Sequence, residues 1–157
     1  MDINKFSLLE EVNKSNAWKH YKKTKPLWAK KLKKAEIVKT LEGELKYNKG
    51  DYLCKGQSGD ILGQKEESLF NKYDPDLSSK PDKDGWQKYL PKPDASGVMA
   101  AQVDHEFSFK HLSWGTFCGN AGDYLVKSYD DKDTEFPEDV WIVKKDIFNA
   151  TYEKYEY

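Results

Sequence analysis

The tetrapeptide Gly50-Asp51-Tyr52-Leu53 recurs without change as Gly122-Asp123-Tyr124-Leu125, 72 positions further along the chain. Residues around it recur at the same separation: Ala29 with Ala101, Gly43 with Gly115, Asn48 with Asn120, and Lys55 with Lys127. Downstream, Leu69-Phe70-Asn71 and Tyr73 match Ile147-Phe148-Asn149 and Tyr152. Self-similarity at a fixed spacing is the signature of an internal repeat. The sequence therefore predicts two copies of one structural unit.

The composition indicates a folded chain in spite of its polarity. Of the 157 residues, 38% are hydrophobic and 34% are charged, and the formal net charge is −1. The chain carries 5 Trp, 10 Tyr and 7 Phe, and aromatic side chains bury large areas. Disordered chains combine few aromatics with high net charge. Because units of about 70 residues are marginal alone, we expect the two copies to share one core in a single compact domain.

The sequence gives no sign of a membrane or secretory segment. No run of about 18 apolar residues is present, and residues 1–5 lack the basic and apolar pattern of a signal peptide. Cys54 and Cys118 fall at positions of the two copies that do not correspond, which argues against a disulfide framework. We therefore expect a cytoplasmic protein with reduced thiols and no membrane partner.

Lysine supplies every basic side chain, and arginine is absent. Arginine provides the rigid fork that recognises phosphate and guanine, so its absence disfavours a sequence-specific DNA reader. Residues 19–34 nevertheless hold eight lysines and no acid. A solvated helix face is the favoured interpretation, and the alternative is a nucleic-acid interface whose affinity falls with salt. The candidate residues for that interface are Lys22, Lys23, Lys30 and Lys31.

Hydrophobic spacing divides the chain into four parts. Three- and four-residue steps through Phe6, Leu8, Leu9, Val12, Ala17, Trp18 and Tyr21 predict helix. Four prolines and several Asp, Ser and Lys residues between 71 and 97 are typical of a linker. The predicted parts are an N-terminal helical segment (1–34), a first repeat (35–74), a Pro-rich linker (75–97) and a second repeat (98–157).

Short alternating segments separated by Gly and Asn/Asp turns indicate antiparallel strands. We predict strands at 37–41, 44–47, 52–54 and from 61, and again at 103–111, 116–118, 124–127 and 140–143. The fold class is therefore α+β, with an N-terminal helical segment followed by two β-meander repeats related by pseudo-twofold symmetry. The predicted core is Tyr52, Leu53, Leu62, Phe70, Phe107, Phe109, Tyr124, Leu125, Trp141, Val143 and Phe148.

The segment from Phe136 to Val143, followed by Asp146 to Glu153, resembles the signature of the PGDYG-domain family of small bacterial and phage proteins. The first repeat is similar through Thr40-Leu41-Glu42-Gly43 and Gly50-Asp51-Tyr52-Leu53. In the name-giving stretch, Pro137 and Asp139 are kept, whereas Glu138, Val140 and Trp141 replace Gly, Tyr and Gly. The resemblance implies the architecture of two tandem copies and no particular activity.

The repeated turn has two interpretations. In the favoured one, Gly takes a positive φ and Asp caps its own backbone. In the other, the two turns line a cleft between the repeats and bind a ligand, together with a histidine and a tryptophan. The candidate ligand-binding residues are Asp51, Tyr52, His105, Trp114, Asp123 and Tyr124.

Three functions follow. The leading hypothesis is a non-enzymatic binding module that holds a small ligand or a protein partner at the repeat interface, with exposed Trp28, Trp86 and Trp114 as anchors. The second is an enzyme with His105 or His111 as acid or base. The third is the lysine-rich nucleic-acid binder. No catalytic residue is assigned, and we expect no metal site and no cofactor.

Overall fold

The N-terminal helix is shorter than the sequence predicts. The computed structural model describes residues 2–111 and 113–155, and its first helix, α1, spans Ile3–Ser15. The Asp2 side chain accepts a hydrogen bond from the Lys5 backbone N–H (3.2 Å) at its start. Asn16 ends it in the left-handed conformation (φ 54°). The prediction of helix to residue 34 is wrong beyond residue 15.

Residues 19–31 form two strands, β1 (Lys19–Lys23) and β2 (Leu27–Lys31). β1 pairs on one side with β9 (Val98–Gln102) and on the other with β14 (Tyr152–Lys154). Its partners are more than 70 residues away in the chain, so the helical spacing of Trp18 and Tyr21 carried no information about them. Strand formation depends strongly on such tertiary context.

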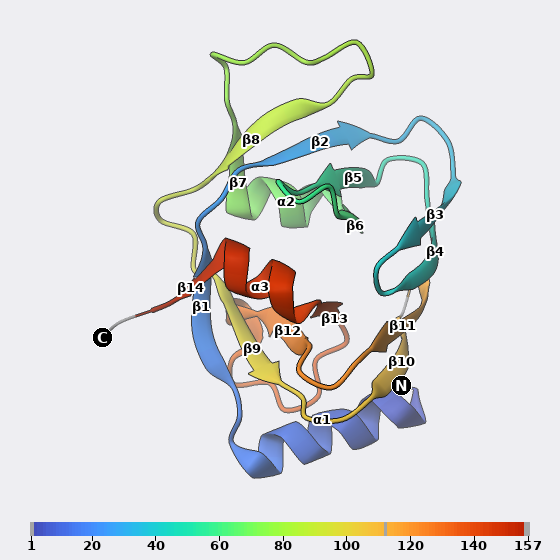
Figure 1. The fold of residues 1–157 in the computed structure, drawn as a ribbon, viewed down its shortest axis with the longest axis vertical. Helices are drawn as coiled ribbons and strands as arrows, with labels where there is room; N and C mark the ends of the chain where they lie inside the picture. Colours follow the sequence, from blue (N-terminus) through green and yellow to red (C-terminus); the bar gives the residue numbers. More distant parts are fainter. Residues whose placement is uncertain (1, 112, 156–157) are drawn as a thin grey trace.

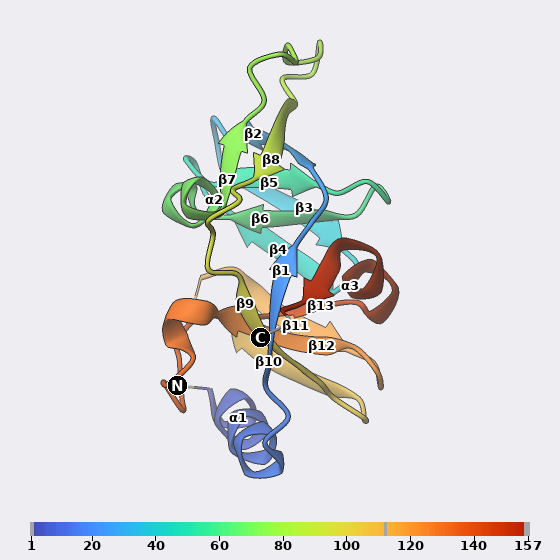
Figure 2. The same cartoon turned by 90° about the vertical axis from the view of Figure 1, so that its left-hand side faces the viewer.

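The strands form two five-stranded antiparallel sheets, one in each half of the molecule (Figures 1 and 2). The first sheet has the order β6 (Ile61–Gln64), β5 (Tyr52–Lys55), β2, β8 (Gln87–Pro91), β7 (Tyr73–Pro75). The second has the order β13 (Val140–Val143), β12 (Tyr124–Ser128), β9, β1, β14, with the 3₁₀ turn η1 (Tyr129–Asp131) after β12. Helix α2 (Glu66–Lys72) belongs to the first half, and α3 (Lys145–Thr151) to the second.

Each sheet contains one strand that the chain reaches by crossing from the other half. The chain leaves β1 in the second sheet and enters β2 in the first; it later leaves β8 in the first sheet and enters β9 in the second. The predicted linker 75–97 contains β8, which lies between β2 and β7 in the first sheet. Trp86 is buried (9% exposed), so it is no exposed anchor.

Two hairpins join the halves on the side opposite the crossings (Figure 1). They are β3 (Glu36–Thr40) with β4 (Gly43–Tyr47), and β10 (Phe107–His111) with β11 (Gly115–Gly119). The Lys46 N–H donates to the Trp114 carbonyl (3.0 Å), and the Cys118 N–H donates to the Glu42 carbonyl (2.7 Å). A Cβ at position 43 would lie 2.8 Å from the Thr116 carbonyl oxygen, so this approach requires glycine.

The largest hydrophobic cluster contains residues of both halves and of α1, including Leu45, Tyr47, Phe109, Phe117 and Ile142. Smaller clusters lie within each sheet and its helix. The predicted core residues that are buried are Leu53, Phe107, Phe109, Tyr124, Leu125, Val143 and Phe148. Those that are half-buried are Tyr52, Leu62 and Trp141.

Phe70 is 40% exposed, so its assignment to the core is wrong. The helix register explains the error. The Leu69 N–H bonds to the Lys65 carbonyl as the Phe148 N–H bonds to the Lys144 carbonyl, and both Leu69 and Phe148 are buried. Position 69, and not position 70, therefore takes the place that Phe148 has in α3. On a helix, a shift of one residue moves a side chain to another face.

The fold is α+β, with an N-terminal helix and antiparallel strands in open sheets. Within residues 2–111 and 113–155, no helix combines the length and the apolar character needed to cross a membrane. The outer limits of the predicted segments, residues 1 and 157, lie outside the described residues.

Replacement of Leu69 by Ala should lower the free energy of unfolding by about 2–5 kcal/mol, because it leaves a cavity in a closed core. Replacement of the neighbouring Phe70 by Ala should cost less than about 1.5 kcal/mol, since only its edge and stacking contacts with Tyr52 and Tyr89 are lost. Urea unfolding measures both. Equal losses for the two variants would contradict the helix register.

Candidate functional site

A cavity of about 560 Å³ lies between the two halves. Residues from both chain crossings, from β6 and α2 of the first half, and from β13 and α3 of the second half line it. The hairpin turns contribute at one end. A volume of 300–1,000 Å³ is typical of small-molecule sites, which often form where two parts of a protein meet. The cavity is therefore the candidate site.

Lys72 enters the cavity wall from the C-terminal end of α2. The Lys92 backbone N–H, on the second crossing, donates to the Lys72 carbonyl (2.8 Å) and fixes this end of the helix. The Lys72 Nζ lies 4.7 Å from the centre of the Trp141 ring, on β13 of the other half. Burial lowers the pKa of Lys72 to about 8, although Asp139 and other acidic groups oppose the shift.

Lys23, at the end of β1, lies between two tyrosines. Its Nζ is 5.7 Å from the ring centre of Tyr73 and 5.6 Å from that of Tyr152. Each tyrosine directly follows a helix, α2 or α3 respectively. Distances below about 6 Å allow a cation–π attraction. The two halves therefore hold one ammonium group between them at the cavity.

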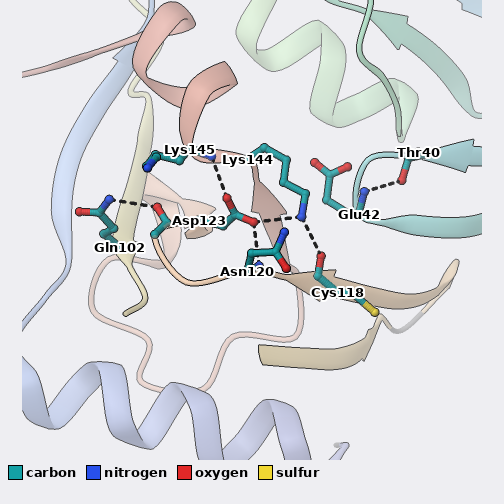
Figure 3. Close-up of polar contacts among 9 residues, drawn as sticks. Thr40, Glu42, Gln102, Cys118, Asn120, Asp123, Lys144 and Lys145 are labelled. Carbon is teal, nitrogen blue, oxygen red and sulfur yellow. Dashed lines mark hydrogen bonds and ion pairs between the residues drawn. The ribbon is translucent and has the colours of Figure 1, made fainter. Parts of the chain in front are cut away.

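Glu42 reaches the cavity from the turn between β3 and β4, and it is 7% exposed. Burial raises the pKa of its carboxyl to about 7, against the opposing influence of Lys144. Figure 3 shows the Glu42 carboxylate beside Lys144, whose ammonium bonds instead to Asp123. A carboxyl that titrates near neutral pH and lines a cavity is able to carry a proton.

His111 is buried at the same end of the cavity. Its Nε2 lies 3.1 Å from Asp139 Oδ1, and its ring stacks on Trp114 at a centroid distance of 4.5 Å. The Ser113 backbone N–H donates to its Nδ1 (3.1 Å). Because Nδ1 accepts a hydrogen bond, the proton of the neutral ring belongs on Nε2, facing the carboxylate.

Three buried polar atoms at the cavity have no hydrogen-bond partner among the described residues: Asp60 Oδ1, Gln64 Oε1 and the Tyr73 hydroxyl. Buried polar groups in native structures are almost always satisfied. Tyr73 is only 3% exposed, and burial raises its pKa well above the usual value, so the hydroxyl keeps its proton. Water or a bound molecule in the cavity would satisfy these atoms.

The two Gly-Asp-Tyr-Leu turns do not line the cavity, but they hold neighbouring segments in place. Gly50 and Gly122 have φ values of 91° and 96°. The Asp51 and Asp123 carboxylates accept from the backbone N–H of Asn48 (2.9 Å) and Asn120 (2.8 Å). Asp51 also accepts from Lys65 and from the Trp114 indole, and Asp123 from Lys144 and the Lys145 N–H (Figure 3). Each carboxylate therefore links its own turn to the start of the following helix, α2 for Asp51 and α3 for Asp123. Asp51 also links its turn to Trp114 of the other hairpin.

Of the six candidate ligand-binding residues, the structure brings Trp114 to the cavity, where it is buried and not exposed as expected. Lys22 and Lys23, which are candidates for the nucleic-acid interface, also line the cavity. Asp51, Asp123, Tyr52, Tyr124 and Trp28 do not line it. His105 lies outside β10, exposed, 2.7 Å from Glu11. It therefore shares no strand face with His111, contrary to the sequence-based expectation.

Lys30 and Lys31 lie elsewhere, in a groove of about 570 Å³ with Lys33, Lys34 and Lys83. Two acidic residues, Glu36 and Asp84, share it. Lys30 also lies over the buried Trp86 ring (4.7 Å). The four lysines that the sequence placed in one nucleic-acid interface are thus divided between this groove and the cavity.

Cys54 lines the cavity as a free thiol, and Cys118 is free and exposed. Burial raises the pKa of the Cys54 thiol to about 12, so it is no nucleophile at neutral pH. Among the described residues, the one group of three His, Cys or acidic side chains close enough to share a metal ion is Glu11, Asp104 and His105. All three are exposed, away from the cavity.

Neither Lys72 nor Glu42 is predicted as a site residue from the sequence, because both gain their properties from distant segments. One pattern did point toward the crossing strands that bound the cavity. Trp18 and Tyr21 have the same spacing as Trp86 and Tyr89. Tyr21 lies in β1 and Tyr89 in β8, and each strand is fourth in the strand order of its sheet.

Replacement of Asp123 by Asn should lower the free energy of unfolding by about 2 kcal/mol at pH 7, because hydrogen bonds to a charged acceptor are lost. Burial raises the pKa of Asp123, but hydrogen bonds from Asn120, Lys145 and Lys144 outweigh it, and the net shift is downward. The carboxylate therefore stabilises the fold above its unfolded-state pKa of about 3.9, and this contribution is lost as the pH falls through the lower folded value.

Urea unfolding of both proteins between pH 7 and pH 2.5 measures the difference, which should shrink in acid. The exposed Asp94→Asn variant is the control and should match the wild type throughout. A difference that stays constant down to pH 2.5 would show that Asp123 stabilises the fold by packing and not by its charge.

Comparison of the chain with protein-family models, with curated proteins and with solved structures finds no match. The cavity and its lining residues are therefore the basis on which a function is assigned.

Proposed function

We propose that the protein binds a small organic anion in the cavity between its two halves, as a non-enzymatic binding module. The observation that carries this proposal is a cavity with an excess of lysine in its wall. Five lysines and three acidic residues line it. Within the described residues, no carboxylate comes within 4.0 Å of the Lys22, Lys23 or Lys72 ammonium groups.

The wall favours a ligand with an apolar or aromatic body. Trp114, Trp141, Tyr73 and Tyr152 contribute rings to it, and Leu27, Val98 and Val143 contribute aliphatic surface. Burial of such surface supplies most of the binding free energy of small ligands, while a few polar groups set orientation. The unsatisfied Gln64 and Tyr73 groups are suited to that second role.

We also infer that the two halves are copies of one unit, related by a pseudo-twofold axis that passes near the cavity. Tyr21 pairs with Val98 and Lys154 as Tyr89 pairs with Leu27 and Pro75. The reciprocal hydrogen bonds between the hairpins support the same relation. Membership of the PGDYG-domain family, whose signature the turns resemble, is part of this proposal.

The corresponding positions at the cavity carry different residues. Lys72 ends α2 where Thr151 ends α3, and Cys54 pairs with Ala29 where Val126 pairs with Ala100. A symmetric cavity would accept a ligand in two orientations. These differences favour one orientation, so we expect one ligand for each chain.

The fluorescent anion 8-anilinonaphthalene-1-sulfonate tests the proposal, with the neutral N-phenyl-1-naphthylamine as its matched analogue. The sulfonate should bind at one site per chain and more tightly than the neutral compound. Lys23→Met should weaken its binding about tenfold, the loss of about 1.4 kcal/mol expected for one charge-assisted contact. Lys34→Met, outside the cavity, should leave it unchanged.

A second pair of variants locates the site. Ser68→Trp places an indole in the cavity from α2 and should abolish binding, whereas Ser7→Trp, on the exposed face of α1, should not. Urea unfolding verifies that both variants fold. Binding that survives Ser68→Trp, or that is equally tight for the neutral analogue, would contradict a cavity site for anions.

A further inference from the structure

We propose that Lys72 is a reactive amine which forms an imine with an aldehyde or ketone group of the molecule in the cavity. This inference rests on the proposed function and adds a substrate class to it: an organic anion that carries a carbonyl group. The carbonyl would lie at Lys72, while the anionic group would lie toward Lys22 and Lys23 on the first crossing.

The fold places the Lys72 amine against the cavity without a carboxylate partner. The end of α2 is fixed by the hydrogen bond from the Lys92 N–H to the Lys72 carbonyl. The side chain then reaches across the cavity wall to Trp141 on the other half (4.7 Å). A cation–π contact with an aromatic face favours the ammonium form less than an ion pair with a carboxylate does.

The other lysines of the cavity wall are placed differently. Lys65 forms an ion pair with the buried Asp51 (3.1 Å), and Lys92 lies 3.8 Å from Asp74. Lys23 lies between two tyrosine rings, and Lys22 is exposed over Tyr155 (5.6 Å). Lys72 and Lys23 are both half-buried without a carboxylate of the described residues within 4.0 Å, but Lys23 lies between two rings whereas Lys72 lies against Trp141 of the other half.

The charges around Lys72 are mixed. Burial and Lys23 lower its pKa, while Asp139, Cys54 and Asp130 raise it, and the result is about 8. An exposed lysine has a pKa of about 10.4, so the neutral amine of Lys72 is roughly two hundredfold more abundant at neutral pH. Desolvation in an apolar pocket is a known way to activate a lysine for attack on carbonyls.

The reaction needs no further co-reactant. Lys72 loses a proton to solvent, and its lone pair attacks the carbonyl carbon to form a C–N bond. The oxygen takes up the electron pair of the C–O double bond and a proton. Loss of that oxygen as water, with the second nitrogen proton, leaves a C–N double bond. One amine and one carbonyl thus give one imine and one water.

Reductive trapping tests the proposal. The folded protein is treated with 4-carboxybenzaldehyde, an aromatic aldehyde with a carboxylate, and with sodium cyanoborohydride, which reduces an imine to a stable amine. Peptide mass spectrometry then follows each lysine with time. Lys72 should be modified at least tenfold faster than Lys46, which is exposed on β4. Its rate should reach half of its maximum near pH 8.

Two controls keep the test independent of folding defects. In the unmodified chain, 4-(hydroxymethyl)benzoate, which has the same shape and no carbonyl, should slow the labelling of Lys72 and not that of Lys46. Lys72→Met should remove the fast adduct, and Lys46→Met should retain it.

The outcomes separate this inference from the function on which it rests. Fast, competed labelling of Lys72 supports both. Binding of 8-anilinonaphthalene-1-sulfonate that Ser68→Trp abolishes, with Lys72 labelled no faster than Lys46, overturns the imine proposal and leaves the anion site standing. Absence of cavity binding together with uniform labelling of the lysines overturns both.

Discussion

The second sheet of this protein depends on β1, a strand that precedes all five strands of the first sheet in the chain. Without β1, β9 and β14 would have no common neighbour, and without β8 the same would hold for β2 and β7. Unpaired backbone groups in a sheet interior are costly. The second sheet therefore cannot be complete before the chain has crossed to the first half and back, whereas the first sheet is formed by strands within residues 27–91 alone.

The two chain crossings also help to fix the separation of the cavity walls. The crossings close the cavity on one side, and the hairpin contacts from Lys46 to Trp114 and from Cys118 to Glu42 close it on the other. Separation of the halves would break both sets of contacts, so the walls are held at a fixed distance. A preformed cavity loses little conformational entropy when a ligand binds, which favours specific recognition of small molecules.

The parts of the fold that sequence reasoning predicted are those whose hydrogen bonds are local. The strands around each Gly-Asp-Tyr-Leu turn were predicted, because the glycine and the aspartate act within four residues. β1 and β8 were not, because β1 pairs with residues 98–100 and 152–154 and β8 pairs with residues 27–29 as well as with β7, and the hydrophobic spacing predicts helix over β1. Of the site, Trp114, His111 and two lysines were named in advance. Lys72 and Glu42 were not, since their shifted pKa values arise from burial by segments far away in the chain.

If the halves are copies, the positions where they agree and differ separate structural from chemical roles. An ion pair of the turn aspartate occurs in each half, Asp51 with Lys65 in the first and Asp123 with Lys144 in the second. At the cavity itself, Lys72 is the last residue of α2, and the corresponding last residue of α3 is Thr151. A group that only held the fold together would be needed twice, because each half has the same turn to stabilise. A group that acts on a single ligand near the axis is needed once, so the unmatched Lys72 is better explained by chemistry than by stability.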